Sequence, residues 1–135
     1  MKYNKPPLAI DQQIDRQRIA DFFNIDESLF VTAIHHFSVI RNICAHHARL
    51  WNRELVVPLK IPKKTPALSN ARFSSGKSAY RIHNSRVILA YLLKNIAPAN
   101  SLICSVKKSL AACPLPLKAM GFEPGWEYFW PWCDC

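Results

Sequence analysis

Residues 27–52 read ESLFVTAIHHFSVIRNICAHHARLWN, and this stretch decides the fold. It contains neither proline nor glycine, and its apolar residues recur at the three- and four-residue spacing of a helix with one buried face. Asp26, just before it, is a suitable N-cap, and the acidic Glu27 favours the positive end of a helix. The pattern therefore predicts one long helix from Glu27 to about Asn52.

Shorter helices are predicted on both sides of this segment. The first runs from Asp11 to about Phe23, because its apolar residues follow a helical spacing and Asn24 interrupts the pattern. Two more are predicted over residues 85–96 and about 101–113. A proline follows each of them, and proline cannot continue a helix.

Two segments carry no regular pattern. Residues 55–80 contain three prolines and one glycine among interleaved basic residues, which predicts a long loop with a short extended piece at 55–57. The C-terminal segment is rich in turns and aromatic side chains, which we expect to pack over the helix ends; a contact surface for a partner is the alternative. Residues 1–135 are thus predicted to form a single all-α domain, a helical bundle with a long basic loop and an aromatic C-terminal segment.

The charge and the cysteines narrow the class of protein. Eighteen Lys and Arg against nine Asp and Glu give a formal net charge of +9, which favours RNA or DNA, with an anionic membrane surface as the alternative. No apolar run is long enough to cross a membrane, and the N-terminal residues lack a signal-peptide core, so we expect a cytoplasmic protein. The five cysteines show no disulfide or zinc spacing. We expect no metal or cofactor, and a reduced, exposed tail at Cys133–Cys135.

One side of the predicted long helix has an unusual set of polar residues. At about 100° per residue, arginines, histidines and an asparagine share a sector of roughly 140° that holds no carboxylate in its middle. Such cations repel one another unless an anion joins them, and a phosphate group is the natural candidate. The residues in this sector are His35, Ser38, Arg41, Asn42, His46, Arg49 and Arg53.

The remaining side chains of the helix have structural interpretations. His36 and His47 project toward the apolar side, so we expect both to be buried and hydrogen-bonded. Trp51 also lies on the apolar side, which favours a core position over a platform for stacked bases.

Few groups are needed to cleave RNA. A base removes the proton of the ribose 2′-hydroxyl, a cation stabilises the phosphorane, and an acid protonates the leaving 5′-oxygen. His46 can serve as the base or acid, Arg41 as the cation and Asn42 as a group that orients the phosphate. Carboxylates are too sparse here for a two-metal nuclease.

A resemblance to a known family supports this hypothesis. Residues 41–46 match the R-x4-H motif of the HEPN superfamily of helical ribonucleases, and RNICAHHARLWNRE is similar to the abortive-infection (Abi) family of bacterial phage-defence proteins. The segments RVILAYLLKNIAP and PLKAMGFEPGWEYFWPW also resemble that family. Its members are typically about twice as long, and this chain resembles their C-terminal half. Without N-terminal helices, part of the apolar stripe would be exposed, so we expect association.

The resemblance implies a HEPN-like fold and a metal-independent endoribonuclease. It further implies a homodimer whose composite active site is shared between subunits, restrained by an antitoxin protein or an RNA. The implied catalytic residues are Arg41, Asn42 and His46. The residues expected to bind RNA are His35, Arg49, Asn52, Arg53, Lys60, Lys63 and Lys64.

The residues leave two other functions open. One is a non-catalytic module that binds RNA or an antitoxin, in which the helix face and the loop cations, including Arg72 and Lys77, hold a phosphate backbone without cleaving it. The other is a helical interaction domain that uses the aromatic segment from Trp126 to Trp132.

Overall fold

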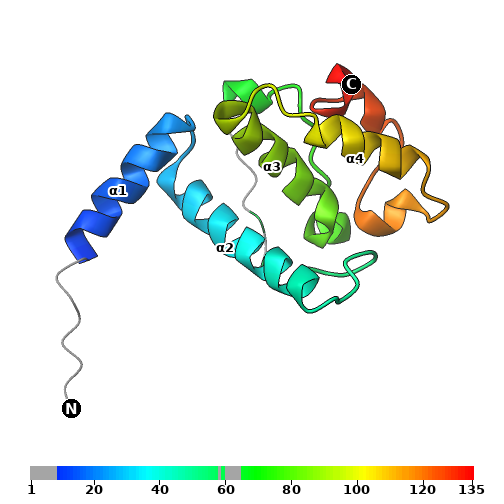
Figure 1. Ribbon diagram of the computed structural model, residues 1–135, viewed down its shortest axis with the longest axis horizontal. Coiled ribbons are helices and arrows are strands. Elements are labelled where there is room, and N and C mark those ends of the chain that lie inside the picture. The colour runs from blue at the N-terminus through cyan, green and yellow to red at the C-terminus, as the bar shows by residue number, and fades with distance from the viewer. Residues whose placement is uncertain (1–8, 58, 60–64) are drawn as a thin grey trace, which may run out of the picture.

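Four helices make up the computed structural model, which describes residues 9–57, 59 and 65–135. They are α1 (Ala9–Phe22), α2 (Glu27–Ala45), α3 (Ile82–Ile96) and α4 (Leu102–Ala111), as Figure 1 shows. Short 3-10 turns lie between α2 and α3 at Pro66–Leu68 and Gly76–Tyr80, and after α4 at Leu117–Met120, Trp126–Tyr128 and Trp132–Asp134. No strand forms within the described ranges, where one isolated bridge pairs Ala71 with Trp130. The prediction of an all-α fold is confirmed.

The end of α2 differs from the prediction. The helix stops at Ala45 rather than near Asn52, and His46 occupies its C-cap. The amide of His47 donates to Cys44 O at 3.0 Å and that of Ala48 to Ile43 O at 3.0 Å, with His47 in the left-handed conformation at φ 52°. This is the hydrogen-bond pattern of a Schellman motif, which ends a helix by satisfying its last carbonyl groups. Residues 48–53 therefore belong to a loop and do not share the polar face of the helix.

α3 lies at the centre of the molecule and joins two buried clusters (Figure 1). The first cluster packs side chains of α1, the first half of α2 and α3 around Val87 and Ile88. The second packs the start of α3, α4 and the aromatic segment around Trp132, with Ile40 and Ile43 of α2 against it. α2 thus touches both clusters along its length, which fixes the direction in which its C-terminal end points.

α1 projects from the rest of the molecule (Figure 1). Ala20 and the following Phe23 are buried, but Ile14, Ile19 and Phe22 are exposed, with Phe22 at 65 %. The predicted apolar stripe of this helix is therefore only partly covered within the described residues. On α2, Val31 and Ile34 are exposed as well.

The aromatic segment is mostly core, as predicted. Trp132 is 1 % exposed and meets Trp126 edge-on at a ring distance of 5.1 Å, and Phe122 packs against both. Tyr128 is the exception, because 83 % of it is exposed. The alternative of an aromatic contact surface is therefore limited to Tyr128 and the half-buried Phe129 and Trp130, which line a surface pocket with it.

The predicted exposure of Cys133–Cys135 is confirmed, but the prediction of a reduced tail is wrong for Cys135. A disulfide joins Cys104 of α4 to Cys135, and Lys107 donates a hydrogen bond of 2.7 Å to the carbonyl of Trp132. The two cysteines are 31 residues apart, so no local spacing in the sequence reveals the pair. Cys44, Cys113 and Cys133 are free thiols.

Two further findings concern the loops and the membrane. The predicted extended piece at residues 55–57 forms no strand, although the amide of Leu55 donates to Tyr80 O at 2.8 Å. Among the helices that the structure describes, none has both the length and the apolar character needed to span a membrane.

Candidate functional site

The C-terminal end of α2 carries the three residues predicted to be catalytic. Arg41 and Asn42 lie in the last two turns and are exposed, and the Arg41 guanidinium donates to Asn42 Oδ1 at 3.1 Å. His46 is exposed at the C-cap. Within the described residues, no hydrogen bond joins the imidazole of His46 to either of them. One copy of the chain therefore joins Arg41 to Asn42 at this helix end, without a hydrogen bond from either side chain to the imidazole of His46.

A shallow depression lies beside Arg41. It has a volume of about 420 Å³ and is lined by Arg41, Asn42 and the side chains of Ile34, Phe37 and Ser38. Ser38 donates to Ile34 O of its own helix at 2.9 Å, so its hydroxyl proton is engaged. His35 is exposed on the same half of the helix. Arg41 and Asn42 thus border a largely apolar depression rather than a closed cleft, and His46 is not part of its lining.

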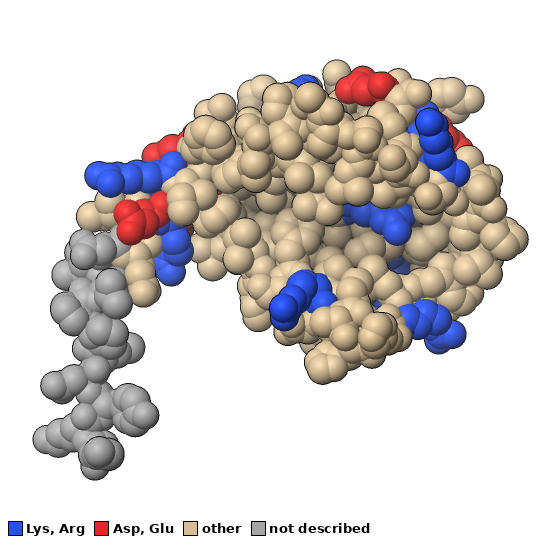
Figure 2. All heavy atoms as spheres, viewed as in Figure 1, with Lys and Arg blue, Asp and Glu red and all other residues tan. Residues whose placement is uncertain are grey.

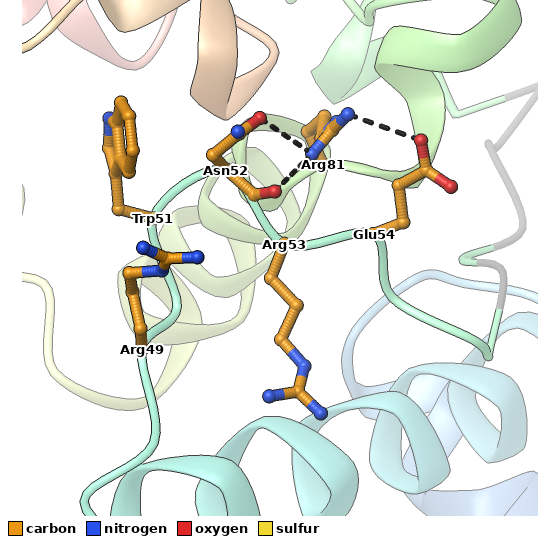
Figure 3. Close-up of a pocket in the computed structure, with 6 residues that line it drawn as sticks. All are labelled: Arg49, Trp51, Asn52, Arg53, Glu54 and Arg81. Carbon is orange, nitrogen blue, oxygen red and sulfur yellow. Dashed lines mark hydrogen bonds and ion pairs between the residues drawn. The ribbon is translucent and has the colours of Figure 1, made fainter.

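A second cavity follows α2 and is rich in arginine (Figure 3). It has a volume of about 470 Å³, and Arg81 forms its back. Arg81 donates to the carbonyl of Asn52 at 2.5 Å and to its Oδ1 at 3.0 Å, and it pairs with Glu54 at 3.1 Å. Asn52 adopts the left-handed conformation at φ 55°, which asparagine tolerates better than most residues. Arg81 therefore holds the loop after α2 in place.

The open part of this cavity is positively charged. Arg49 lies with its guanidinium carbon 5.9 Å from the centre of the Trp51 ring, and Arg53 points away from Arg81 (Figure 3). Neither forms an ion pair with a carboxylate of the described residues, whereas Glu54 is engaged with Arg81. A guanidinium binds a phosphate through two parallel hydrogen bonds, so this cavity suits the backbone of a nucleic acid.

The rest of the surface charge is dispersed. On the face shown in Figure 2, Lys and Arg side chains lie apart from one another and do not form one continuous patch. Arg72 is exposed but pairs with Glu123 at 3.1 Å and lies over the Phe129 ring at 5.1 Å. The arginine cavity beside α2 is therefore a local concentration of charge rather than part of a broad basic face.

His36 fixes α2 to the rest of the molecule. Its side chain is buried, with Nδ1 2.7 Å from Val57 O and Nε2 2.6 Å from Ser85 Oγ of α3. Because Val57 O can only accept, the ring carries its proton on Nδ1, and Nε2 accepts from the serine hydroxyl. Burial lowers the pKa of His36, so the ring is held neutral. The prediction of a buried, hydrogen-bonded histidine is confirmed here.

A comparison with known families can now be added to this geometry. Residues 8–52 match the family model described as Abi-like protein. This segment, about a third of the chain, is therefore similar to Abi-like proteins. Searches of curated protein sequences and of solved structures gave no match.

The segment shared with Abi-like proteins coincides with the candidate site. It spans about a third of the chain, from just before α1 to Asn52 in the arginine cavity. It therefore includes the stretch from Arg41 to His46 and also Arg49. The family model thus matches α1, α2 and the loop that follows α2, which carry the candidate site.

The structure brings some of the other predicted residues together and separates others. Arg49, Asn52 and Arg53 come together in the cavity, but they lie in a loop and not on the predicted helical face. His47 was expected to be buried and is exposed, because the chain turns out of the helix there. Trp51 is half-buried and packs against the second cluster, in agreement with the prediction. Lys60, Lys63 and Lys64 lie outside the described residues.

Arg81 is a residue of the candidate site that the sequence did not reveal. It precedes α3 and reaches back across 29 residues of sequence to Asn52. Neither the helical periodicity nor the family string covers it. A single charged residue at the start of a helix carries no signal for a contact so distant in the sequence.

Proposed function

We propose that this protein is a metal-independent endoribonuclease of phage defence, with Arg41, Asn42 and His46 as its reacting groups. The observation that carries the proposal is the R-N-x3-H string at the exposed end of α2, inside the segment that matches the Abi-like family. The arginine cavity next to it supplies contacts for the RNA backbone. We further propose that the chain forms a single HEPN-like helical domain.

The active site of the proposal is shared by two copies of the chain. Ile34, Ser38 and Arg41 lie one turn apart along a single stripe of α2. Ile34 is 47 % exposed, and α1 carries further exposed apolar side chains at Ile14, Ile19 and Phe22. Burying this surface in a homodimer would set the two α2 ends against each other. A composite cleft would then hold two copies of the triad, which supports a dimer as the active form.

The chemistry of the proposal is the attack of a ribose on its own phosphate. A neutral His46 accepts the proton of the 2′-hydroxyl, and the 2′-oxygen bonds to phosphorus. Arg41 stabilises the added negative charge of the phosphorane, and Asn42 orients a phosphate oxygen. The bond from phosphorus to the 5′-oxygen then breaks, and that oxygen takes a proton from the second His46 in its protonated form. The products are a 2′,3′-cyclic phosphate and a 5′-hydroxyl.

RNA enters this site across the loop that follows α2. Arg49 and Arg53 would contact phosphates, with Asn52 and His35 as further polar contacts. The activity would be toxic to the bacterial host, so an antitoxin protein or RNA is expected to restrain it in the cytoplasm until infection.

The test is an RNA cleavage assay in excess EDTA with end-labelled structured RNAs. We expect cleavage by the wild type and at least a hundredfold loss in His46→Ala and in Arg41→Ala. His47→Asn is the matched control, because it changes the adjacent exposed histidine while keeping a residue that tolerates its left-handed conformation. Equal activity of the wild type and His46→Ala would refute the proposed role of His46.

A non-catalytic RNA-binding module is the second candidate function. The separation of His46 from Arg41 within one copy, together with the arginines of the cavity, favours it. It predicts binding that weakens steeply with salt and yields no product. A variant with Arg49→Ala and Arg53→Ala would then lose affinity and salt dependence together.

A further inference from the structure

A groove separate from the α2 end runs between α3 and α4. Its volume is about 530 Å³, which lies within the range of small-molecule sites. Its wall on α4 is largely apolar and includes Leu102, Val106 and Leu110, and Leu115 extends this wall after the helix. Arg86 of α3 also lines the groove and is its one charged side chain among the described residues, with Ser105 and Ser109 as polar neighbours.

Arg86 has no counter-ion. Its Nη1 atom is buried without a hydrogen-bond partner, and no carboxylate of the described residues pairs with it. Its guanidinium carbon lies 5.5 Å from the centre of the Phe122 ring, a contact that compensates only part of the lost hydration. Burial also lowers the pKa of Arg86. A buried guanidinium without a partner is costly, which makes an anion at this place favourable.

The second unpaired polar atom of the groove is also a donor. Trp51 lines the groove, and its Nε1 is buried without a hydrogen-bond partner. Ser109 offers no competing donor, because its hydroxyl already donates to Ser105 O at 3.0 Å. Both atoms are shielded from solvent, so what the groove offers a ligand is the unpaired positive charge of Arg86 beside an apolar wall. A ligand that complements this lining carries a negative charge at one end and an apolar body at the other.

We infer that this groove binds a free monocarboxylate with a medium-length alkyl chain, with the carboxylate on Arg86 and the chain along α4. A carboxylate matches the guanidinium through two parallel hydrogen bonds. A phosphate dianion would bring more charge and more bound water into an apolar groove, so its desolvation would cost more. This inference is independent of the proposed ribonuclease activity, because it uses neither Arg41 nor His46.

The inference can be tested by isothermal titration of the whole protein with octanoate. We expect binding that strengthens about three- to fourfold for each added methylene from butyrate to octanoate, since each buried methylene contributes about 0.8 kcal/mol. We expect no saturable binding of inorganic phosphate and at least tenfold weaker binding of 1-octanol. Equal binding of octanol and octanoate, or no binding of octanoate at millimolar concentration, would overturn the inference.

Two variants locate the site. Arg86→Met keeps a long side chain and removes the buried charge, and we expect an unchanged thermal midpoint or a higher one together with at least a tenfold loss of octanoate affinity. Lys108→Met is the matched control on exposed α4, and we expect it to bind as the wild type does. Should Arg86→Met fail to fold, Leu102→Asp serves in its place. Leu102 is 46 % exposed, and an added carboxylate in the groove wall would repel octanoate. Unchanged affinity in the folded variant would contradict the site.

Discussion

Replacing His36 by alanine tests how α2 is held. The ring is 3 % exposed and makes two short hydrogen bonds, to Val57 O and to Ser85 Oγ. Each bond contributes about 1 kcal/mol, and the lost ring volume adds about 1 kcal/mol or more. We therefore expect His36→Ala to lower the free energy of unfolding by about 3 kcal/mol, and the thermal midpoint by about 10 °C. Urea denaturation followed by circular dichroism measures this change.

The matched control is the neighbouring histidine. His35 is exposed, and we expect His35→Ala to change the unfolding free energy by less than about 0.5 kcal/mol. A double-mutant cycle with Ser85→Ala isolates the bond to α3, and we expect a coupling of about 1 kcal/mol. Equal stabilities of His36→Ala and His35→Ala, or a coupling of zero, would show that the hydrogen bonds of His36 do not hold α2 in place.

The same residue makes stability depend on pH. The pKa of His36 is lowered by burial, whereas in the unfolded chain it has the ordinary value of about 6.5. Below that pH the unfolded chain takes up a proton that the buried ring resists, so the folded state loses stability as the pH falls from about 6.5 toward the folded pKa. We expect His36→Ala to reduce this slope without abolishing it, because burial lowers the pKa of His83 as well. Urea titrations between pH 5 and 7.5 would show an unchanged slope if the ring were not buried.

Three further substitutions have expected effects that the same urea titrations measure. Cys104→Ser should lower the free energy of unfolding by about 3–4 kcal/mol, because it removes the disulfide that closes a loop of 31 residues of sequence. Cys44→Ser removes a free thiol and should have no measurable effect. Five free thiols in the unreduced wild type would contradict the disulfide. Gly121→Ala should lower the free energy of unfolding by at least about 2 kcal/mol, since its φ is +88° and an added Cβ would come within 2.7 Å of a side-chain atom. Gly76→Ala is the control, because its added Cβ meets no atom within 4 Å, and it should cost only about 1 kcal/mol. Equal costs would show that the close approach at Gly121 is absent. Tyr91→Phe removes a hydrogen bond of 2.6 Å to a buried carbonyl and should cost about 1–2 kcal/mol, and an unchanged midpoint would mean that water replaces the hydroxyl.

The sequence predicts helices well where the chain marks its own helix ends. Pro98 and Pro114 follow α3 and α4, and the expected ends lie within two residues of the observed ones. The end of α2 was missed because a Schellman motif usually has glycine or asparagine in its left-handed position, and here that residue is His47. Periodicity continued past this point, so the wheel placed Arg49 and Arg53 on a helix that had already ended.

Whether a residue of the site can be predicted depends on how far apart it and the residue it contacts lie in the sequence. Arg41, Asn42 and His46 lie within two turns of one another, so the local pattern groups them, but it predicts a position inside a longer helix, whereas His46 is the C-cap of α2. The role of His36 in packing also followed from its side of the helix. Arg81 and the pair Cys104–Cys135 act over 29 and 31 residues, and nothing local distinguishes them. Tertiary contacts of that range require the fold itself.

The two buried clusters have a consequence for how the molecule opens. Each cluster is a contiguous unit. The Cys104–Cys135 disulfide links the elements of the cluster around Trp132 covalently. The other cluster is covered at one end by α1, and much of the apolar surface of α1 is itself exposed. Such units open independently, at free energies that follow their burial. Amide protons of α1 should therefore exchange with solvent fastest and those at the centre of α3 slowest. A partner that covers α1 would slow only the first class, so the pattern of exchange would reveal where that partner sits before its identity is known.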